Sequence, residues 1–262
     1  MDFLMPFHLS FPLVFAAGLI AGAMNSIAGG GSFVAFPTLL FCGVPPVAAS
    51  ATNMVALWPG SLAGTAAFYH RLRGLTGLWS LSLMSVAGGL FGAWLLLQTT
   101  DADFRALVPW LLLMATFVFT FGNRLTARWK IAHLEPVPPK VGPALLMAQA
   151  AVAIYGGYFG GGIGIMMLAA LTIFGYQDIH SINAIKNWLA SLINGVAFVA
   201  FTVSGKVYWP FALAMMAGAI IGGYTGAVAA QRLSPVKVRK GIVIFAWILT
   251  GVFFVESVWR GW

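Results

Sequence analysis

Polar side chains that could bind an anion stand inside an apolar stretch of this chain. The segment 181–198, "SINAIKNWLASLINGVAF", repeats them every three or four positions, at Asn183, Asn187, Ser191 and Asn194. That spacing places them on one face of a helix. Lys186 stands beside this face, and it is a functional candidate because a buried ammonium is costly inside a membrane. Snorkelling to the headgroups is the alternative for Lys186, and interhelical hydrogen bonding is the alternative for the asparagines.

Two glycine runs offer a second way to bind an anion, through backbone N–H groups. They stand in "IAGGGSFVAFP" (27–37) and "GYFGGGIGI" (157–165). Glycine permits a sharp turn, and the N–H groups at the start of the following half-helix attract negative charge. The runs comprise Gly29, Gly30 and Gly31, and then Gly160, Gly161 and Gly162. Close helix packing is the alternative role of glycine, and we expect it at Gly22, Gly88, Gly92, Gly222 and Gly226.

The residues that catalysis or metal binding would need are missing from the apolar stretches. The carboxylates fall at termini, loops or span ends, at Asp2, Asp101, Asp103, Glu135, Asp178 and Glu256. The histidines lack the spacing of a metal site, and no catalytic triad or HExxH motif is present. We therefore expect no enzyme, no metal and no cofactor. Asp178 and His180 form a pair that could titrate at the entrance of a span.

The overall composition is that of an integral membrane protein. Of 262 residues, 60% are hydrophobic and 8% are charged, which leaves too little polar surface for a water-soluble domain. The net charge of +8 lies in short loops and forms no basic helix face, which argues against nucleic acid as a partner. Cys42 is the only cysteine, so we expect no intrachain disulfide. The first apolar stretch lacks a basic n-region and is expected to stay in the mature protein.

The chain contains two similar copies of one pattern. Aligning the glycine runs pairs Gly31 with Gly162, and one short insertion then pairs Asn53 with Asn187. We interpret this as an internal duplication. The expected units are a first transmembrane repeat, a cytoplasmic linker and a second transmembrane repeat, at 1–121, 122–141 and 142–262.

The distribution of positive charge indicates how each glycine-interrupted stretch meets the membrane. If the stretch crosses once, both copies face the same way and the positive-inside rule is broken. If it is a hairpin, the basic loops at 70–74, 122–140 and 231–240 share the cytoplasmic side. We therefore predict an all-α polytopic membrane protein of two inverted-topology repeats. Each repeat is a glycine-interrupted re-entrant helical hairpin followed by three transmembrane helices, and both termini are periplasmic.

Two segments resemble the signatures of a known family. The segment 25–57, "NSIAGGGSFVAFPTLLFCGVPPVAASATNMVAL", is similar to the first signature of the TauE/SafE family of membrane permeases. The segment 155–175, "YGGYFGGGIGIMMLAALTIFG", is similar to the second. The resemblance covers essentially the whole chain. It implies transport of sulfur-containing anions across the bacterial inner membrane, namely export of sulfite or of small organosulfonates such as sulfoacetate.

Carried over to this chain, the family motifs define a candidate substrate site with residues from both copies. They are Asn25, Gly29, Gly30, Gly31, Thr52 and Asn53 in the first copy, and Gly160, Gly161, Gly162, Lys186 and Asn187 in the second. The second copy has Gly156 in place of Asn25 and Lys186 in place of Thr52, so only one half carries the positive charge. Helix capping is the alternative role for Asn25 and Thr52.

We expect a permease that exports a sulfonate or sulfite by alternating access, driven by the membrane potential. Moving one negative charge outward is worth about 2.3 kcal/mol per 100 mV, so no coupling-ion site is needed. Asn53, Asn187 and Lys186 are expected to meet the anion together with the N–H groups of the glycine turns. The expected partners are a small anionic substrate and the lipid bilayer, and a homodimer is left open. Proton-coupled uptake and a non-transporting scaffold subunit are the alternatives.

Overall fold

The computed structural model describes the backbone of residues 7–27, 30–68, 72, 77–132, 141–176, 178–230 and 235–260. Over these residues the chain forms ten α-helices and no strand, which confirms the all-α class. The first five are α1 (Phe7–Ile27), α2 (Ser32–Phe41), α3 (Pro46–Phe68), α4 (Leu78–Gln98) and α5 (Asp101–Ala132). The other five are α6 (Pro143–Tyr158), α7 (Ile163–Ile173), α8 (Ile179–Val203), α9 (Trp209–Ala230) and α10 (Pro235–Arg260).

Among the described residues, two helices have the length and hydropathy of a membrane span. They are α4 and the Ser181–Val203 part of α8. At 1.5 Å per residue, each is long enough to cross about 30 Å of hydrocarbon. The helix α5 continues to Ala132, so the first part of the expected linker, residues 122–132, is helical.

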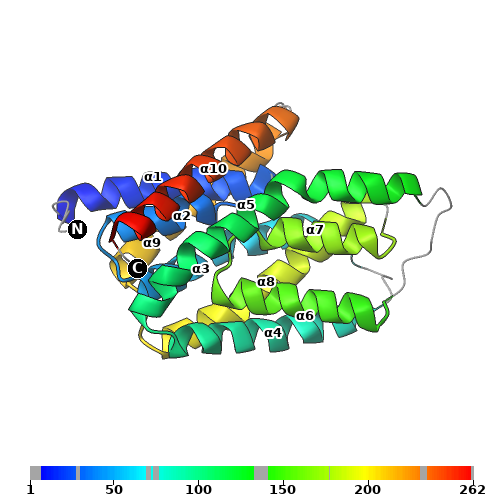
Figure 1. The fold of residues 1–262 in the computed structure, drawn as a ribbon, viewed down its shortest axis with the longest axis horizontal. Coiled ribbons are helices and arrows are strands. Elements are labelled where there is room, and N and C mark those ends of the chain that lie inside the picture. Colours follow the sequence, from blue (N-terminus) through cyan, green and yellow to red (C-terminus); the bar gives the residue numbers. More distant parts are fainter. Residues whose placement is uncertain are drawn as a thin grey trace.

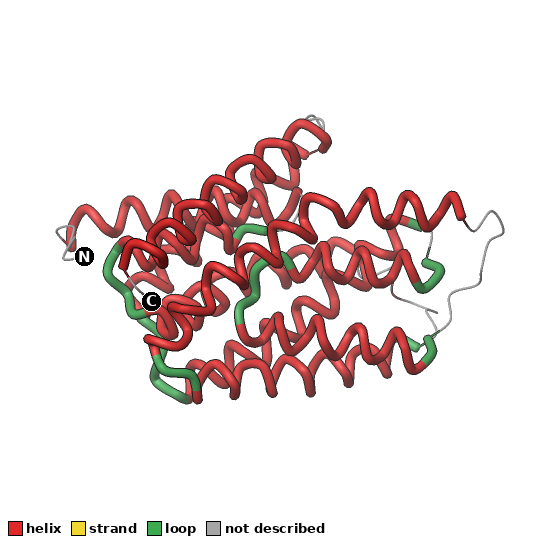
Figure 2. The backbone as a smooth tube through the Cα atoms, viewed as in Figure 1, coloured by secondary structure: helices red, strands yellow, loops and turns green. Residues whose placement is uncertain are grey.

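The helices are interrupted at both glycine runs, once between α1 and α2 and once between α6 and α7. Gly30, Gly160 and Gly162 have φ angles of 96°, 77° and 79°, in the left-handed region that favours glycine. A Cβ added at Gly31 would lie 2.2 Å from the carbonyl oxygen of Ala21. Because this turn is so tight, α2 lies back along α1 (Figure 1). Figure 2 shows both turns near the middle of the long axis, while the other described loops lie toward its ends.

Each broken helix packs against a helix from the other half of the chain. The helix α1 lies along α9, and α6 lies along α4. A Cβ added at Gly222 would lie 1.8 Å from the carbonyl oxygen of Leu19. At Gly92 the corresponding distance, to the carbonyl oxygen of Ile154, is 2.1 Å. The predicted packing role is therefore confirmed at Gly22, Gly88, Gly92, Gly222 and Gly226.

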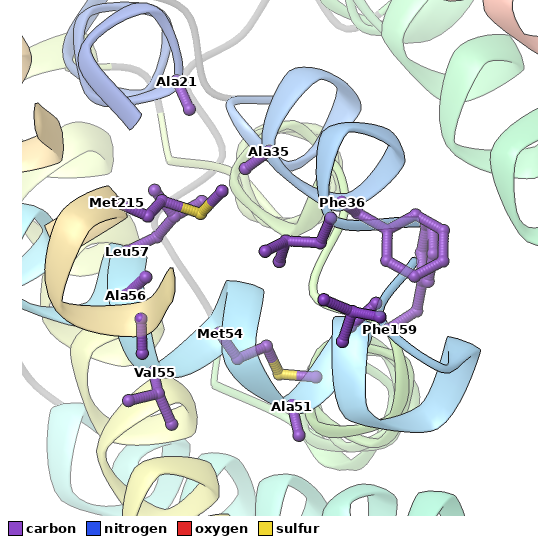
Figure 3. Packing of buried hydrophobic residues seen from close by; sticks show 14 of the residues in the cluster. Ala21, Ala35, Phe36, Ala51, Met54, Val55, Ala56, Leu57, Phe159 and Met215 are labelled. Carbon is purple, nitrogen blue, oxygen red and sulfur yellow. The ribbon is translucent and has the colours of Figure 1, made fainter. Parts of the chain in front are cut away.

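The helices α3 and α8 form the centre of the molecule and pack against each other. The helix α3 also packs against α9, and α8 packs against α4. Phe36 of α2, Met54 of α3 and Phe159 of the second turn belong to one buried hydrophobic core (Figure 3). The described start of α1 and the described end of α10 lie toward the same end of the molecule (Figure 1).

Candidate functional site

The side chain of Asn53 on α3 is fully buried beside the start of α2. Its exposed fraction is 0%, and its Nδ2 donates a hydrogen bond of 3.2 Å to the Oγ of Ser32. Ser32 is the first residue of α2. The Oδ1 atom of Asn53 has no hydrogen-bond partner among the described residues. Leaving such an oxygen buried and unpaired costs about 1–3 kcal/mol, so Asn53 carries an unpaired polar group at a position that the sequence predicted for the site.

The turn between α6 and α7 reaches the same part of α3. A Cβ added at Gly160 would lie 3.1 Å from the Cγ of Met54, which follows Asn53 directly. The Oγ of Ser50 donates a hydrogen bond of 3.4 Å to the carbonyl oxygen of Tyr158, the last residue of α6. The turns that lead into α2 and α7 come from opposite halves of the chain, and they meet on α3 beside Asn53.

Aromatic rings cover this meeting point. Phe36 of α2 makes edge contacts with Phe159, at 5.4 Å between ring centroids, and with Phe104 of α5, at 6.2 Å. Phe104 also contacts Tyr158, at 5.4 Å. Phe36 and Phe159 approach each other in Figure 3, and the three phenylalanines are buried. The helix α2 runs from its glycine turn toward the end of the molecule where α1 begins and α10 ends, so Phe36 lies on that side of the turn.

Lys186 of α8 lies at the start of α7. Its Cδ is 3.4 Å from the position that a Cβ would take at Gly164, the second residue of α7. Gly162 precedes the helix in a left-handed conformation, and its carbonyl oxygen accepts the N–H of Ile165 at 3.1 Å. The stem of Lys186 therefore runs beside the positive end of a helix dipole.

Asn187 lies away from Asn53, so the structure does not bring these two predicted site residues together. The backbone carbonyl oxygen of Asn187 accepts a hydrogen bond of 3.0 Å from the Oγ1 of Thr65. Thr65 and Asn53 stand 12 positions apart on α3, which is about 18 Å along the axis at 1.5 Å per residue. The physical reason is that α3 and α8 run in opposite directions where they cross. Asn53, near the start of α3, therefore lies on one side of the crossing, and Asn187, near the start of α8, lies on the other.

Two other polar residues of the predicted site have partners in the protein. The Oδ1 of Asn25 accepts the N–H of Gly31 at 2.8 Å, and the Oγ1 of Thr52 accepts the N–H of Tyr208 at 2.9 Å. These bonds fit the capping alternative. The described glycines of the two turns are Gly30, Gly31, Gly160, Gly161 and Gly162. Gly29 lies outside the described residues.

Asp178, expected as one half of a titrating pair, caps the start of α8. Its Oδ2 accepts the N–H of Ser181 at 3.0 Å and the Oγ–H of the same residue at 2.7 Å. The side chain of His180 lies outside the described residues. Across the described part of the chain, no group of three or more His, Cys, Asp or Glu side chains could hold a metal ion.

Known proteins resemble this chain along nearly its whole length. A family model described as "Sulfite exporter TauE/SafE" matches residues 14–254. The chain belongs to the TauE/SafE family. A "Probable membrane transporter protein" of Haemophilus influenzae is 28% identical and aligns over 94% of this chain and 95% of its own length. "Probable membrane transporter protein ORF9" of Sinorhizobium sp is 29% identical, over 97% and 98%. "Probable membrane transporter protein YfcA" of Escherichia coli K12 is 27% identical, over 94% and 90%.

The names of its relatives indicate that this TauE/SafE protein is a membrane transporter, and the family predicted from the two signatures is confirmed. The first signature supplies the turn before α2 as well as Asn53. Sequence reasoning missed Met54 and Phe36 as neighbours of the site. Both stand within the first signature, and Met54 is adjacent to Asn53, so the signature itself was the signal that could have found them.

Proposed function

We propose that this TauE/SafE protein is a permease that exports small sulfur-containing anions across the bacterial inner membrane by alternating access. Its substrates are sulfite or two- and three-carbon organosulfonates such as sulfoacetate. The observation that carries the proposal is the meeting of the two glycine turns beside the buried amide of Asn53. The starts of α2 and α7 direct positive dipole ends toward this place, which favours a negative solute. None of the buried polar side chains among the described residues is a carboxylate, so no fixed negative charge opposes the anion there.

The amide of Asn53 suits a sulfonate or sulfite oxygen. The oxygen and nitrogen of an asparagine amide differ little in shape, so the amide can turn over within the same space. After this rotation, Oδ1 accepts a hydrogen bond from the hydroxyl of Ser32. Nδ2 then occupies the position at which Oδ1 has no partner in the present orientation. A hydrogen bond from this N–H to an anion contributes about 1.5–3 kcal/mol. The turned amide is therefore the binding group that we assign to Asn53.

Lys186 supplies the positive charge of the proposed site. An ammonium beside the positive end of α7 is unfavourable by itself, because two positive groups then lie close together. An anion held between them relieves that repulsion and is attracted by both. Lys186 stands next to Asn187 on α8 and packs on Gly164, so it meets the anion at the start of α7, at a different step of transport from Asn53. Of the residues predicted for the site, we therefore retain Asn53, Lys186 and the turn glycines as contacts along the path of the anion, and we assign Asn25 and Thr52 to support.

The helix order supports the two inverted-topology repeats, each with a re-entrant hairpin. The chain repeats the order of a broken helix followed by three further helices, in α1–α5 and again in α6–α10. The pairing of α1 with α9 is matched by that of α6 with α4, as a two-fold relation between the copies requires. We assign the repeats to 1–121 and 142–262, with a cytoplasmic connection at 122–141 and periplasmic termini. The membrane potential, worth about 2.3 kcal/mol per charge per 100 mV, then drives an anion outward.

Alternating access by rocking or sliding of one repeat against the other is the simplest expectation, but we infer that the moving parts are not the two repeats themselves. Glycines bring the backbones of α1 and α9 close together, as they do those of α4 and α6, and both pairs connect one repeat with the other. Moving one repeat as a body would separate all of these contacts. We therefore infer that α1, α2 and α9 form one moving body, and that α4, α6 and α7 form the other. The crossing of α3 and α8 lies between them.

The test is anion flux in liposomes that hold a negative potential inside. Sulfite and sulfoacetate are compared with acetate, in the wild type and in Lys186→Gln. We expect flux of the sulfur anions to fall about tenfold or more in Lys186→Gln, which corresponds to about 1.4 kcal/mol. Lys206→Gln is the matched control, because Lys206 is exposed in the loop before α9, and its flux should match that of the wild type.

Three outcomes would overturn the proposal. If flux persists at zero potential and follows an imposed pH gradient, proton-coupled uptake replaces export by the membrane potential. If neither sulfur anion crosses the membrane or raises the thermal stability of the protein, the assignment of substrate fails. If no solute crosses the membrane even with the wild type, and Lys186→Gln changes only folding or partner capture, the scaffold alternative is favoured.

A further inference from the structure

A hollow of about 680 Å³ opens between α3, α4 and α8. This volume lies within the range of small-ligand sites, about 300–1,000 Å³. Most of its lining is aliphatic or aromatic, and includes Trp58, Leu62, Leu90, Trp188, Val196 and Val199. We propose that one acyl chain of a membrane phospholipid binds in this groove. The proposal does not depend on which solute the protein transports.

The polar groups that line the groove are already paired within the protein. The indole N–H of Trp58 donates to the carbonyl oxygen of Ser191 at 3.2 Å, and that of Trp188 donates to the Oγ of Ser82 at 2.8 Å. The hydroxyls of Thr65 and Ser191 lie 2.7 Å apart and share a hydrogen bond. With these donors committed, the lining attracts hydrocarbon rather than an anion or a chain of water molecules.

The groove runs along helices that could cross a membrane. Two of its walls are α4 and α8, which are also the helices with the length and hydropathy of a span. The residues at its rim are apolar and exposed: Leu90 by 51%, Val199 by 60% and Val203 by 83%. Exposed aliphatic side chains on spanning helices face lipid, so an acyl chain reaches the groove sideways from the bilayer.

The groove and the proposed anion site lie on opposite faces of α8. Lys186 and Trp188 are two positions apart, which is about 200° around a helix of 3.6 residues per turn. Lys186 packs on α7, whereas Trp188 lines the groove. A chain in the groove therefore contacts the crossing of α3 and α8 from behind and does not compete with the transported anion.

Hydrocarbon is the occupant that the groove accepts most readily. An apolar hollow of this kind stays dry, and its walls lose dispersion contacts if nothing fills it. A second copy of the chain would need an interface of about 800 Å² on each partner, whereas this hollow has the size of a ligand. In a bilayer, close packing rather than the hydrophobic effect determines what binds to a helix surface, and a flexible acyl chain can follow the irregular walls.

The test is photo-cross-linking in liposomes whose phospholipid carries a diazirine in the middle of one acyl chain. Mass spectrometry then maps the labelled residues. If the groove holds a chain, Ser191 should be labelled at least as strongly as Val252 on α10. Ser191 is only 6% exposed and Val252 is 55% exposed, so lipid that merely passes over the surface would label Ser191 about one-ninth as often.

Variants that fill the groove make the test specific. Val199→Trp places a large ring at the mouth of the groove and should lower the labelling of Ser191 several-fold. Val252→Trp is the matched control, and it should leave the labelling of Ser191 unchanged.

Three results would overturn the proposal. The first is labelling that is proportional to the exposed fraction of each side chain. The second is labelling of Ser191 that stays the same in Val199→Trp. The third is a change of oligomeric state in Val199→Trp without any label in the groove. The last result would mean that a second copy covers the groove. Anion flux is measured in the same liposomes as a separate readout, so a failure of the transport proposal is distinguished from a failure of this one.

Discussion

Replacing Asn53 by leucine should stabilise the protein and weaken anion transport at the same time. The buried Oδ1 without a partner costs about 1–3 kcal/mol, and leucine removes it. The substitution also removes the bond from Nδ2 to Ser32, worth about 0.5–1.5 kcal/mol. The difference lies between about −0.5 and +2.5 kcal/mol, and its centre is a gain of about 1 kcal/mol in the free energy of unfolding. At about 2–4 °C per kcal/mol, the thermal midpoint should rise by about 2–4 °C.

The same substitution should weaken binding of the anion. It removes a hydrogen bond to a charged group, which contributes about 1.5–3 kcal/mol, and the apparent affinity should fall by about 10- to 150-fold. Thermal unfolding in detergent, with and without sulfite or sulfoacetate, measures stability and binding in one experiment. Flux in liposomes measures transport by the same variant.

Asn194→Leu is the matched control. The Nδ2 of Asn194 donates to the Oγ of Ser61 at 3.3 Å, and Asn194 lies on α8 outside the proposed site. Its replacement should lower stability by about 0.5–1.5 kcal/mol and leave the affinity for the anion unchanged. If Asn53→Leu lowered the thermal midpoint as Asn194→Leu does, and sulfite still bound with the wild-type affinity, Asn53 would be a packing residue and the reasoning would be refuted.

Three further predictions concern the helices around the site. Gly222→Ala should lower the thermal midpoint because its Cβ would meet the carbonyl oxygen of Leu19, a form of overpacking that costs about 1–3 kcal/mol. Gly251→Ala, where an added Cβ meets nothing within 4 Å, should leave the midpoint equal or higher, and equal losses in both variants would contradict the packing role. Phe36→Ala should open the aromatic cover, and small anions should then leak through the protein in liposomes held at a constant potential. A leak equal to that of the wild type would show that the rings do not close the path. A membrane-impermeant maleimide should label Cys42 in intact cells if the end of α2 faces the periplasm. Burial raises the pKa of the Cys42 thiol, so labelling should be slow at neutral pH and faster as the pH rises.

The sequence was sufficient for the features that local chemistry decides. Three glycines in succession predicted both helix breaks, and the structure places Gly30, Gly160 and Gly162 in conformations that favour glycine. The small residues at four-residue spacing predicted close helix contacts, which Gly222 and Gly92 make. In each case the residue type alone restricts the backbone or the distance between helices, so no knowledge of the tertiary arrangement was needed.

The site could be predicted only in part, because it depends on which helices meet. Asn53 and Asn187 match in sequence, yet the antiparallel crossing of α3 and α8 places them at different depths. The contact of Gly160 with Met54 joins residues from different copies, and nothing in either segment specifies it. Thr52 provides a further example, since its partner Tyr208 stands 156 positions later in the chain.

The pairing of α1 with α9 also constrains how the protein is made. The last residue of α1 is Ile27 and the first of α9 is Trp209, so α1 leaves the ribosome roughly 10–40 s before its partner at 5–20 residues per second. During that interval its glycine face lacks the partner that it has in the folded protein. A truncated chain that ends after the first repeat can insert but cannot complete this contact, so quality control in the membrane should remove it.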